Sequence, residues 1–507
     1  MRIRPIHFLA MAYIAFSGNN SVSAQEPDPA FGTNGKVYTS FGSFSSYFQS
    51  MVVLPDEKIV ATGYNTNTTF SILIARYNSD GTPDLSFNTT GKKQIDFGSA
   101  YEFCYSILAQ DDEKLVLAGS SNGNAAMARL LPDGSYDGSF SEDGKLTLSF
   151  GAGNGSSFQK ILLQPDGKIV AIGEAYNTNS FDFAIARFHP DGSADDTFGE
   201  GGKTTIDFNN YNDFGRNAIL QTDGKIVVVG AAKNSNGNSS IALLRLNADG
   251  TPDITFGAGG KTTLTISGVA DDYAEAVALD ENNRIITGGY SAGDFLVLRF
   301  NTNGIVDPSF GTNGYTLTDF DEFQDKAYAL TIDDDGNIYL GGHGYETGNG
   351  GLFHFAVAKY TSNGLPDTTF DLDGKMTIVM GADQSTVFDM VVQPEGKILF
   401  AGQSTGVQGG FTEFALFRLR NTTTGIPGKD PESLDIHLFP NPAADFIRMD
   451  PASSGLIRVY DVLGVMVLQT YSAGSTDRMD ISMLPAGLYY LSISDHKKTR
   501  SFRFIKK

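Results

Sequence analysis

A unit of about 55 residues recurs seven times between Asp28 and Arg420, and this repetition constrains the fold more than any single motif. Almost all the variation in the unit's length falls in one connection. A repeat array that varies in one connection usually places those connections on the same face, and that face is often where binding occurs. The sequence therefore predicts a fold and a candidate binding face, but it does not by itself indicate a chemical activity.

Three landmarks locate each unit. The first is the Phe of a D-x-x-F turn, at Phe31, Phe87, Phe140, Phe198, Phe256, Phe310 and Phe370. The second follows a tight turn, at Lys58, Lys114, Lys168, Lys225, Arg284, Asn337 and Lys397. The third is basic, at Arg76, Arg129, Arg187, Arg245, Arg299, Lys359 and Arg418. The first and second lie 27 or 28 residues apart and the third lies 11 before the next Phe, whereas the second and third are 15 to 22 apart.

The third unit shows what one repeat predicts. Residues 145–150 alternate apolar and polar side chains, as a half-buried strand does. Residues 160–164 and 168–173 are two apolar runs rich in β-branched side chains and joined by Asp-Gly, which is a hairpin signal. Residues 181–188 form a fourth strand pattern. Seven four-stranded antiparallel units predict an all-β, seven-bladed β-propeller.

The order of the strands also predicts how the ring closes. We name the strand before the Asp-Gly turn A, the strand after it B, the strand with the basic landmark C, and the strand after the D-x-x-F turn D. The first D strand, residues 36–41, precedes any A strand, and the last unit ends with its C strand at Arg420. The first D strand is therefore expected to complete the last blade, which removes exposed sheet edges. An open β-solenoid is the alternative, although its coils are usually shorter.

Segments outside the repeats predict an exported protein. Residues 1–24 read as a secretory signal peptide, with Arg2 and Arg4 before a short apolar stretch and Val22-Ser23-Ala24 as the cleavage pattern. The mature chain would begin at Gln25, with the propeller over residues 25–420. An uncleaved membrane anchor is the alternative, but the apolar stretch is short for a bilayer. No later segment is apolar enough to span a membrane, so the mature chain is expected to have no span.

Charge and cysteine content narrow the class of partner. The net charge of −21 divides into −25 for the repeats and linker, +2 for the C-terminal segment and +2 for the leader. An acidic surface of this size argues against nucleic acid as a partner.

Cys104 is the only cysteine, so stability must come from burial, and we expect this thiol to be a small buried side chain.

A different β pattern follows the repeats. Residues 421–433 form a polar linker, and residues 434–507 contain several short strand patterns that predict a small Ig-like β-sandwich. Four ordered motifs make this segment resemble the type A C-terminal sorting domain of the bacterial type IX secretion system. The residues that carry the resemblance are Phe439, Pro440, Asn441, Pro442, Gly464, Gly487, Tyr489, Lys506 and Lys507.

The resemblance implies a route and a partner. The signal peptide would carry the chain into the periplasm, and the type IX secretion machinery would export it across the outer membrane. The sorting domain is typically cleaved in that family, and the cargo is released or attached to the cell surface. An ordinary sandwich module with another partner is the alternative reading of the same strands.

The repeats are similar to the delta-60 repeat family, whose units begin D-x-x-F-G-x-x-G-K and contain a Q-x-D-G-K-I hairpin. Residues 256–261 and 221–226 carry both patterns. The second unit departs from them with Asn88 after its Phe, and the fifth has Asn283 in a longer hairpin turn. The family implies a propeller but no agreed biochemical activity.

Apparent catalytic motifs have structural explanations. The Asp and the basic landmark recur in every unit, which favours turn capping and pairing between blades over seven active sites. G-x-S-x-G occurs around Ser121, Ser291 and Ser404, always seven residues after the second landmark, which favours a turn over a nucleophile. His343 and His354 flank the longest variable loop and could meet across it, although two histidines alone make a weak metal site. We predict no catalytic residue, metal or cofactor.

The variable loops between strands B and C are rich in Asn, Ser, Gly and Tyr, a composition that suits contact with a glycan or a protein surface and also suits plain exposed loops. The sequence favours a monomeric, non-catalytic binding protein. The alternatives are an extracellular polysaccharide lyase or hydrolase with its site at the central mouth of the ring, and a passive spacer. The candidate ligand-binding residues are Tyr64, Asn65, Tyr176, Asn177, Lys233, Tyr290, His343, Tyr345 and Phe411.

Overall fold

The computed structural model describes two stretches of the chain. They are residues 26–420, except 68, 152–154, 269, 322–323, 347–350, 372, 382 and 408–409, and residues 437–507, except 440–442, 451–453, 461–465, 474–477 and 495–498. The predicted signal peptide and linker lie outside the described residues. The chain divides into two compact units, Met1–Thr423 and Thr424–Lys507.

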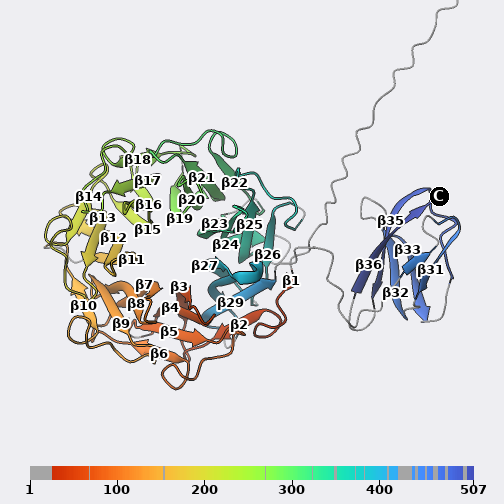
Figure 1. Ribbon diagram of the computed structural model, residues 1–507, viewed down its shortest axis with the longest axis horizontal. Helices are drawn as coiled ribbons and strands as arrows, with labels where there is room; N and C mark the ends of the chain where they lie inside the picture. Colours follow the sequence, from red (N-terminus) through yellow and green to blue (C-terminus); the bar gives the residue numbers. More distant parts are fainter. Residues whose placement is uncertain are drawn as a thin grey trace, which may run out of the picture. The chain divides into compact units, whose positions relative to one another are not determined.

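The first unit is a ring of seven antiparallel sheets (Figure 1), which confirms the predicted seven-bladed propeller. Each sheet has the spatial order A-B-C-D, and the A strands lie nearest the centre of the ring (Figure 1). The A strands are β3 (Ser46–Val53), β7 (Glu102–Ala109), β11 (Ser156–Leu163), β15 (Asp213–Leu220), β19 (Asp272–Leu279), β23 (Lys326–Ile332) and β27 (Ser385–Val392).

The other three strands of each blade lie progressively farther out. The B strands are β4 (Ile59–Asn65), β8 (Leu115–Ser121), β12 (Ile169–Asn177), β16 (Ile226–Lys233), β20 (Ile285–Ser291), β24 (Ile338–Glu346) and β28 (Ile398–Thr405). The C strands are β5 (Ile72–Tyr77), β9 (Asn124–Leu130), β13 (Ser180–Phe188), β17 (Ser239–Leu246), β21 (Asp294–Phe300), β25 (Leu352–Tyr360) and β29 (Thr412–Arg420). The D strands are β6 (Lys92–Ile95), β10 (Lys145–Leu148), β14 (Lys203–Ile206), β18 (Lys261–Leu264), β22 (Tyr315–Thr318), β26 (Lys375–Ile378) and β2 (Lys36–Thr39).

Closure of the ring follows the prediction. Strand β2 pairs antiparallel with β29, with Lys36 opposite Phe417, so the first D strand completes the seventh blade. A further short strand, β1 (Glu26–Pro27), pairs with the end of β29. This closure excludes the open solenoid, because the two ends of the repeat region share one sheet.

A buried clamp formed by the Arg, Asp and Phe landmarks holds six of the seven blades. In the first blade, Arg76 Nε donates to Asp84 Oδ2 at 2.7 Å, and the guanidinium carbon lies 4.8 Å from the centre of the Phe87 ring. Arg76 Nη1 donates to the carbonyl of Pro132 in the next blade. The clamp therefore both fixes the C–D turn and joins neighbouring blades, as the sequence predicts.

The same clamp closes the ring, with its parts contributed by opposite ends of the repeat region. Arg418 Nε on β29 donates to Asp28 Oδ2 at 2.9 Å and stacks over Phe31, 4.4 Å from the ring centre. Arg418 Nη1 donates to the carbonyl of Ser79 in the first blade at 2.7 Å. The sixth blade departs from the pattern, because Lys359 replaces the Arg and lies over Tyr339.

Every A strand contains a β-bulge at the same position. In each A–B pair the register shifts by one residue, for example between Gly215 and Asn217, so that the intervening residue has no partner on the B strand. The bulged residues are Gln49, Tyr105, Gln159, Arg216, Glu275, Tyr328 and Phe388. The bulge explains why the third A strand begins at Ser156 and not at Lys160 as the apolar run predicts, since the extra residue breaks the alternation.

A glycine on each B strand accommodates the bulge. A Cβ added to Gly230 would lie 1.9 Å from the carbonyl oxygen of Phe214, a distance that no real contact allows. The same separation of 1.9 Å to an A-strand carbonyl occurs at all seven positions. These glycines are Gly63, Gly119, Gly173, Gly230, Gly289, Gly342 and Gly402. Each lies five residues after the second landmark of its unit.

The hydrophobic core lies between the blades. Val60 and Ile72 on the first blade pack in one cluster with Cys104 and Ile107 on the second, and equivalent clusters join other neighbouring blades. Cys104 is fully buried, which confirms the prediction of a small buried side chain, and burial raises the pKa of its thiol to about 11.

The second unit forms two facing sheets, as predicted for a small sandwich. One sheet has the order β30-β31-β34 and the other β33-β32-β35-β36. The strands are β30 (His437–Phe439), β31 (Phe446–Asp450), β32 (Ser454–Tyr460), β33 (Met466–Ala473), β34 (Arg478–Asp480), β35 (Gly487–Ser494) and β36 (Thr499–Lys506). In the first unit, a 3₁₀ turn, η2 (Pro394–Gly396), lies between the A and B strands of the seventh blade.

Within the described residues no helix is long and apolar enough to cross a membrane.

Several residues of the sorting motif have structural roles. Tyr489 stacks on Phe504 with ring centres 5.6 Å apart, and its hydroxyl donates to the carbonyl of Pro485 at 2.9 Å. The Lys507 amide donates to Ala443 at 2.7 Å, and Lys506 is largely buried. Gly487 begins β35 and Phe439 ends β30. The motif positions Pro440, Asn441, Pro442 and Gly464 lie outside the described residues.

Substituting Gly230 by Ala should destabilise the propeller by at least about 2 kcal/mol, because the new Cβ would collide with the Phe214 carbonyl and force the bulge open. Urea unfolding followed by circular dichroism measures the change. Gly138→Ala is the control, since the nearest atom to its added Cβ is 3.7 Å away. Equal stability of the two variants would contradict the proposed role of the glycine.

Substituting Asp28 by Asn should cost about 3 kcal/mol, since it leaves the buried Arg418 guanidinium without its carboxylate. Although burial raises the pKa of Asp28, the Ala30 amide, Arg418 and Lys397 lower it below 3.8 overall. The carboxylate therefore stabilises the ring above pH 3.8, and the effect is lost as pH falls through the folded-state pKa.

Urea unfolding at pH 7 and at acid pH tests this expectation. The difference between the wild type and Asp28→Asn should shrink below about pH 4. Asp56→Asn serves as the control because its pair with Lys58 is exposed and should contribute at most about 1 kcal/mol. A difference that stays constant with pH would show that the Asp28 charge does not close the ring.

Candidate functional site

The bulged residues meet at an axial pocket in the centre of the ring. The pocket has a volume of about 640 Å³ and is lined by residues from all seven A strands, with Glu174 contributed by β12. Volumes of about 300 to 1,000 Å³ are typical of small-molecule sites. Because each bulge directs one extra side chain toward the axis, the pocket wall carries Gln, Tyr, Arg, Glu and Phe in addition to aliphatic groups.

Charged side chains from three consecutive blades lie together in this pocket. Arg216 on β15 has Nη1 3.7 Å from Glu174 Oε2, which belongs to the preceding blade. Glu275 on β19 belongs to the following blade, and its backbone carbonyl accepts a hydrogen bond from Asn217 Nδ2 at 3.2 Å. The side chains of Arg216 and Glu174 are 28% and 18% exposed, so they remain accessible from the pocket.

The pKa values of Arg216, Glu275 and Glu174 are all raised in this group. Burial alone would lower the pKa of Arg216, but the charges of Glu275 and Glu174 raise it. Burial raises the pKa of Glu275, and the opposing effects of Arg216 and Lys326 are smaller. Burial likewise raises the pKa of Glu174 against the effect of Arg216. The pocket therefore holds one guanidinium beside two carboxyl groups whose pKa values lie above their ordinary range.

A second polar group lies on the opposite wall. Asp389 on β27 accepts hydrogen bonds from the Met51 and Met390 amides, each at 2.9 Å, and from Ser50 Oγ at 3.3 Å. Burial raises the pKa of Asp389, and Lys160 across the pocket opposes the rise. These bonds join the last blade to the first at the pocket wall.

Aromatic side chains surround one mouth of the pocket, at the end of the ring that carries the B–C loops. Over the first two blades, Tyr64 stacks on Tyr47 with ring centres 5.5 Å apart and meets Phe103 edge-on at 5.0 Å. Phe103 stacks on Tyr105, 6.1 Å away, which lines the pocket itself. Farther out, Phe70 contacts Phe103 and the exposed Tyr101. These rings form a continuous aromatic surface from the rim into the pocket.

The opposite side of the mouth is aromatic as well. Tyr290 stacks on Tyr273 with ring centres 5.1 Å apart, and Lys326 Nζ lies 4.8 Å from the centre of the Tyr290 ring. Tyr328, in the pocket wall, contacts Phe388 at 5.0 Å and His343 at 5.7 Å. Burial lowers the pKa of His343 to about 4, so this imidazole is neutral at pH 7.

The structure separates the candidate ligand residues into two groups. Tyr64, Tyr290 and His343 follow the B-strand glycines directly and lie at the mouth of the axial pocket. The other candidates lie farther along the B–C connections. Tyr176 is 37% exposed and packs edge-on against Phe181, and Phe411 is also 37% exposed. Lys233 ends β16 and is half-buried, and the Tyr345 amide donates to Asp325 Oδ1 at 2.9 Å.

Two expectations for individual residues are wrong. Asn65 is only 2% exposed, and its Oδ1 accepts the Ser71 amide at 3.1 Å, so it organises the B–C connection and offers no surface to a ligand. His343 and His354 do not meet across the loop. His343 is opposite Phe355 and His354 is opposite Gly344, which places the two imidazoles on opposite faces of the sheet. Asn177, by contrast, is exposed, and its Nδ2 donates to Asp182.

The G-x-S-x-G pattern has a structural origin. Its first glycine is the bulge glycine in each case, for example Gly289, and its last glycine has a positive φ in the turn, as Gly293 does at 102°. Ser291 is fully buried, and its hydroxyl donates to Asp272 Oδ1 at 2.6 Å. The serine is therefore buried at the end of β20, and the turn that the repeated register predicts follows it at Ala292 and Gly293.

The sequence interpretation did not identify the pocket-lining residues. A signal was present, since every bulged residue lies nine positions before the second landmark, from Gln49 before Lys58 to Phe388 before Lys397. This position varies among Gln, Tyr, Arg, Glu and Phe within an otherwise regular strand. A residue type that varies at one fixed position of the repeat, opposite a B-strand glycine that does not vary, would have indicated that this position faces the pocket.

Comparisons with known proteins agree with this architecture. A family model described as "Domain of unknown function (DUF5122) beta-propeller" matches seven segments: residues 54–87, 110–140, 164–198, 221–256, 281–310, 334–370 and 393–422. A second, described as "Secretion system C-terminal sorting domain", matches residues 437–507. No curated protein matches the chain.

Several solved structures show distant likeness. Virginiamycin B lyase from Staphylococcus aureus has 13% identity and a TM-score of 0.45, covering 75% of this chain and 98% of its own. A protein of unknown function from Dyadobacter fermentans has 12% identity and a TM-score of 0.43, covering 78% and 100%. The β-propeller domain of the trilobed protease from Pyrococcus furiosus has 10% identity and a TM-score of 0.37, covering 74% and 95%.

Both resemblances drawn from the sequence are thus confirmed. The sorting domain marks the chain for type IX export, to the cell surface or into the medium. The chain therefore contains a DUF5122 β-propeller domain of seven repeats, followed by a secretion system C-terminal sorting domain.

Proposed function

We propose that the protein is a non-catalytic, exported binding protein that holds a glycan in the axial pocket and against its aromatic mouth. The observation that carries the proposal is the arrangement of Tyr105, Tyr328 and Phe388 beside Arg216 and Glu275 in one pocket. Sugar rings present apolar faces, which pack on aromatic rings, and hydroxyl groups, which both donate and accept hydrogen bonds.

The polar groups of the pocket suit an uncharged ligand. Arg216 and Lys160 supply donors, Asp389 supplies an acceptor, and Gln49 and Gln159 supply both. Positive and negative groups are mixed over the wall, so the pocket does not concentrate one sign of charge as a phosphate site would. A neutral oligosaccharide meets these requirements better than an anionic ligand.

The aromatic mouth extends the site beyond the pocket. Tyr64 and Phe103 lead outward from Tyr105 to the exposed Tyr101, which provides stacking surfaces for more than one ring. We therefore propose that the pocket takes the end of a chain and that the mouth holds the units next to it. The outer B–C loops, which differ in length, then limit the approach of the rest of the glycan or of its carrier.

Glycan-array screening of the mature full-length chain, followed by calorimetry on the best ligand, tests the proposal. Tyr105→Ala and Arg216→Gln should each weaken binding at least about tenfold, since each removes a group from the pocket wall. Tyr176→Ala is the matched control at the outer loop and should leave the affinity within about twofold. A chain that binds no glycan, or that captures a protein through the outer loops, would contradict the proposal.

A polysaccharide-active enzyme is the second candidate, and the presence of two carboxyl groups, Glu174 and Glu275, in one pocket favours it. Glycoside hydrolysis typically uses two carboxyl groups, one of them protonated near neutral pH. Product release from a panel of polysaccharides tests this. Turnover by the wild type that is lost in Glu275→Gln while binding remains would establish the enzyme, whereas binding without turnover would support the first proposal.

A further inference from the structure

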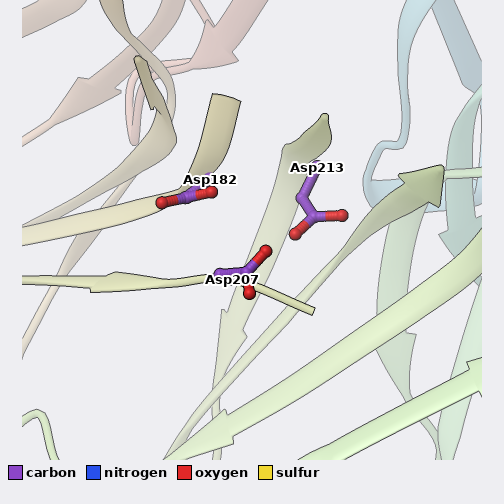
Figure 2. A group of neighbouring side chains, drawn as sticks. All are labelled: Asp182, Asp207 and Asp213. Carbon is purple, nitrogen blue, oxygen red and sulfur yellow. The ribbon is translucent and has the colours of Figure 1, made fainter. Parts of the chain in front are cut away.

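Three aspartates gather at the junction between the third and fourth blades, away from the axial pocket. Asp182 lies on β13, Asp207 follows β14 and Asp213 begins β15. Figure 2 shows their carboxyl groups facing a common point from three separate segments of the chain. One oxygen from each lies within 4.8 Å of the others. Two oxygens bound to one ion at about 2.4 Å can be at most that far apart.

The hydrogen bonding of Asp213 leaves one oxygen unused. Asp213 is fully buried, and its Oδ2 accepts the Phe208 amide at 2.7 Å. Its Oδ1 is buried and has no hydrogen-bond partner. A buried, unpaired carboxylate oxygen is costly, and this residue turns toward two further carboxylates (Figure 2). A bound cation would satisfy that oxygen and offset the repulsion among the three groups.

The three carboxyl groups of the cluster outnumber the cationic side chains that face Asp213. The charged groups that face Asp213 are Asp182, Asp207 and Lys261, and the Lys261 ammonium is directed to the backbone carbonyl of Asp207 at 2.6 Å. Burial, together with the neighbouring charges of Asp207 and Asp182, raises the pKa of Asp213 to about 7. Asp182 is also buried, and Ser180 and Asn177 donate to its two oxygens.

Equivalent positions at other junctions show that the fold does not require these carboxylates. Between the fourth and fifth blades the positions hold Ser240, Thr265 and Asp272, and the two hydroxyls bond each other at 2.8 Å. Both oxygens of Asp272 accept hydrogen bonds, from Ile266 and Ser291. This blade junction thus forms with one carboxylate and two hydroxyl groups, so the two further carboxylates at the third-to-fourth junction are not needed for the fold.

A second group, Asp294, Asp319 and Asp325, occupies the same positions between the fifth and sixth blades. There the buried Asp325 is already satisfied, since the Tyr345 amide donates to its Oδ1 at 2.9 Å and the Phe320 amide donates to its Oδ2 at 2.7 Å. The unpaired oxygen therefore distinguishes the Asp213 cluster from this relative.

We propose that Asp182, Asp207 and Asp213 bind one divalent cation, with Ca²⁺ preferred, at the junction of the third and fourth blades. A donor set made only of oxygens selects hard cations, and Ca²⁺ tolerates the irregular geometry of side chains from three segments better than Mg²⁺ does. Export places the chain where Ca²⁺ is abundant enough for sites with dissociation constants of about 10⁻⁴ to 10⁻³ M.

The ion would join two blades on the face that carries the B–C loops. Asp207 and Asp213 bracket the connection from the third to the fourth blade, and the Phe181 amide already donates to Asn212 Oδ1 in that connection at 3.0 Å. Removing the ion should loosen this junction without opening the closure at β29.

Calorimetry with CaCl₂ and thermal unfolding with and without EDTA, both on the mature full-length chain, test the proposal. Ca²⁺ should raise the unfolding midpoint, because an ion that binds only the folded chain stabilises it. Calorimetry should show saturable Ca²⁺ binding with a dissociation constant of about 10⁻³ M or tighter. A midpoint unchanged by Ca²⁺ up to about 10 mM would overturn the proposal.

Variants assign the effect to the cluster. Asp213→Asn and Asp207→Asn should each weaken Ca²⁺ binding at least about tenfold, and Asp207 is only half-buried, so its variant should fold even if the first does not. Glu102→Gln is the control, because Glu102 occupies the position of Asp213 at the first junction with a single carboxylate, Asp96, beside it. Wild-type affinity in Asp207→Asn, or equal loss in Glu102→Gln, would also overturn the proposal.

Discussion

The rest of the propeller depends on a steric constraint at one atom per blade. The B-strand glycine, for example Gly230, leaves room for an A-strand carbonyl that a Cβ would meet at 1.9 Å. That close approach permits the bulge, and the bulge directs an additional side chain to the ring axis without displacing the alternating core residues on either side. The chain can therefore vary the axial residue, from Gln49 to Arg216 to Phe388, while the blade stays the same.

The two ends of each blade carry different groups of side chains. The A–B and C–D turns contain the clamp of Arg, Asp and Phe, in which Arg418 with Asp28 and Phe31 repeats at the closure what Arg76 does within one blade. The B–C and D–A connections contain the aromatic mouth and the cluster around Asp213. The clamps are thus concentrated at one end of the ring and the proposed binding groups at the other, so the loops can differ in length without disturbing the clamps.

Much of the fold follows from local signals in the sequence. Asp-Gly turns, period-two strands and the placement of residues 36–41 before any A strand were enough to predict the blades and their closure. The site was less accessible, because bulges break the period-two pattern that identifies strands and hide residues such as Arg216 and Glu275. The composition of the loops also led to a wrong candidate. Asn65 is of a type common at surfaces, but it is buried and its side chain accepts a hydrogen bond from the Ser71 amide. The Asp213 cluster could not be predicted, since its members lie up to 31 residues apart and meet only through the pairing of separate strands.

The central claim is that recognition occurs at the axis of the ring and not on the outer loops. A crystal structure of the protein with its best glycan ligand tests this most directly. The account predicts sugar density between Tyr105 and Arg216, with further units over Tyr64 and Phe103. Density confined to the outer B–C loops around Tyr176, with the axial pocket free of sugar, would contradict it.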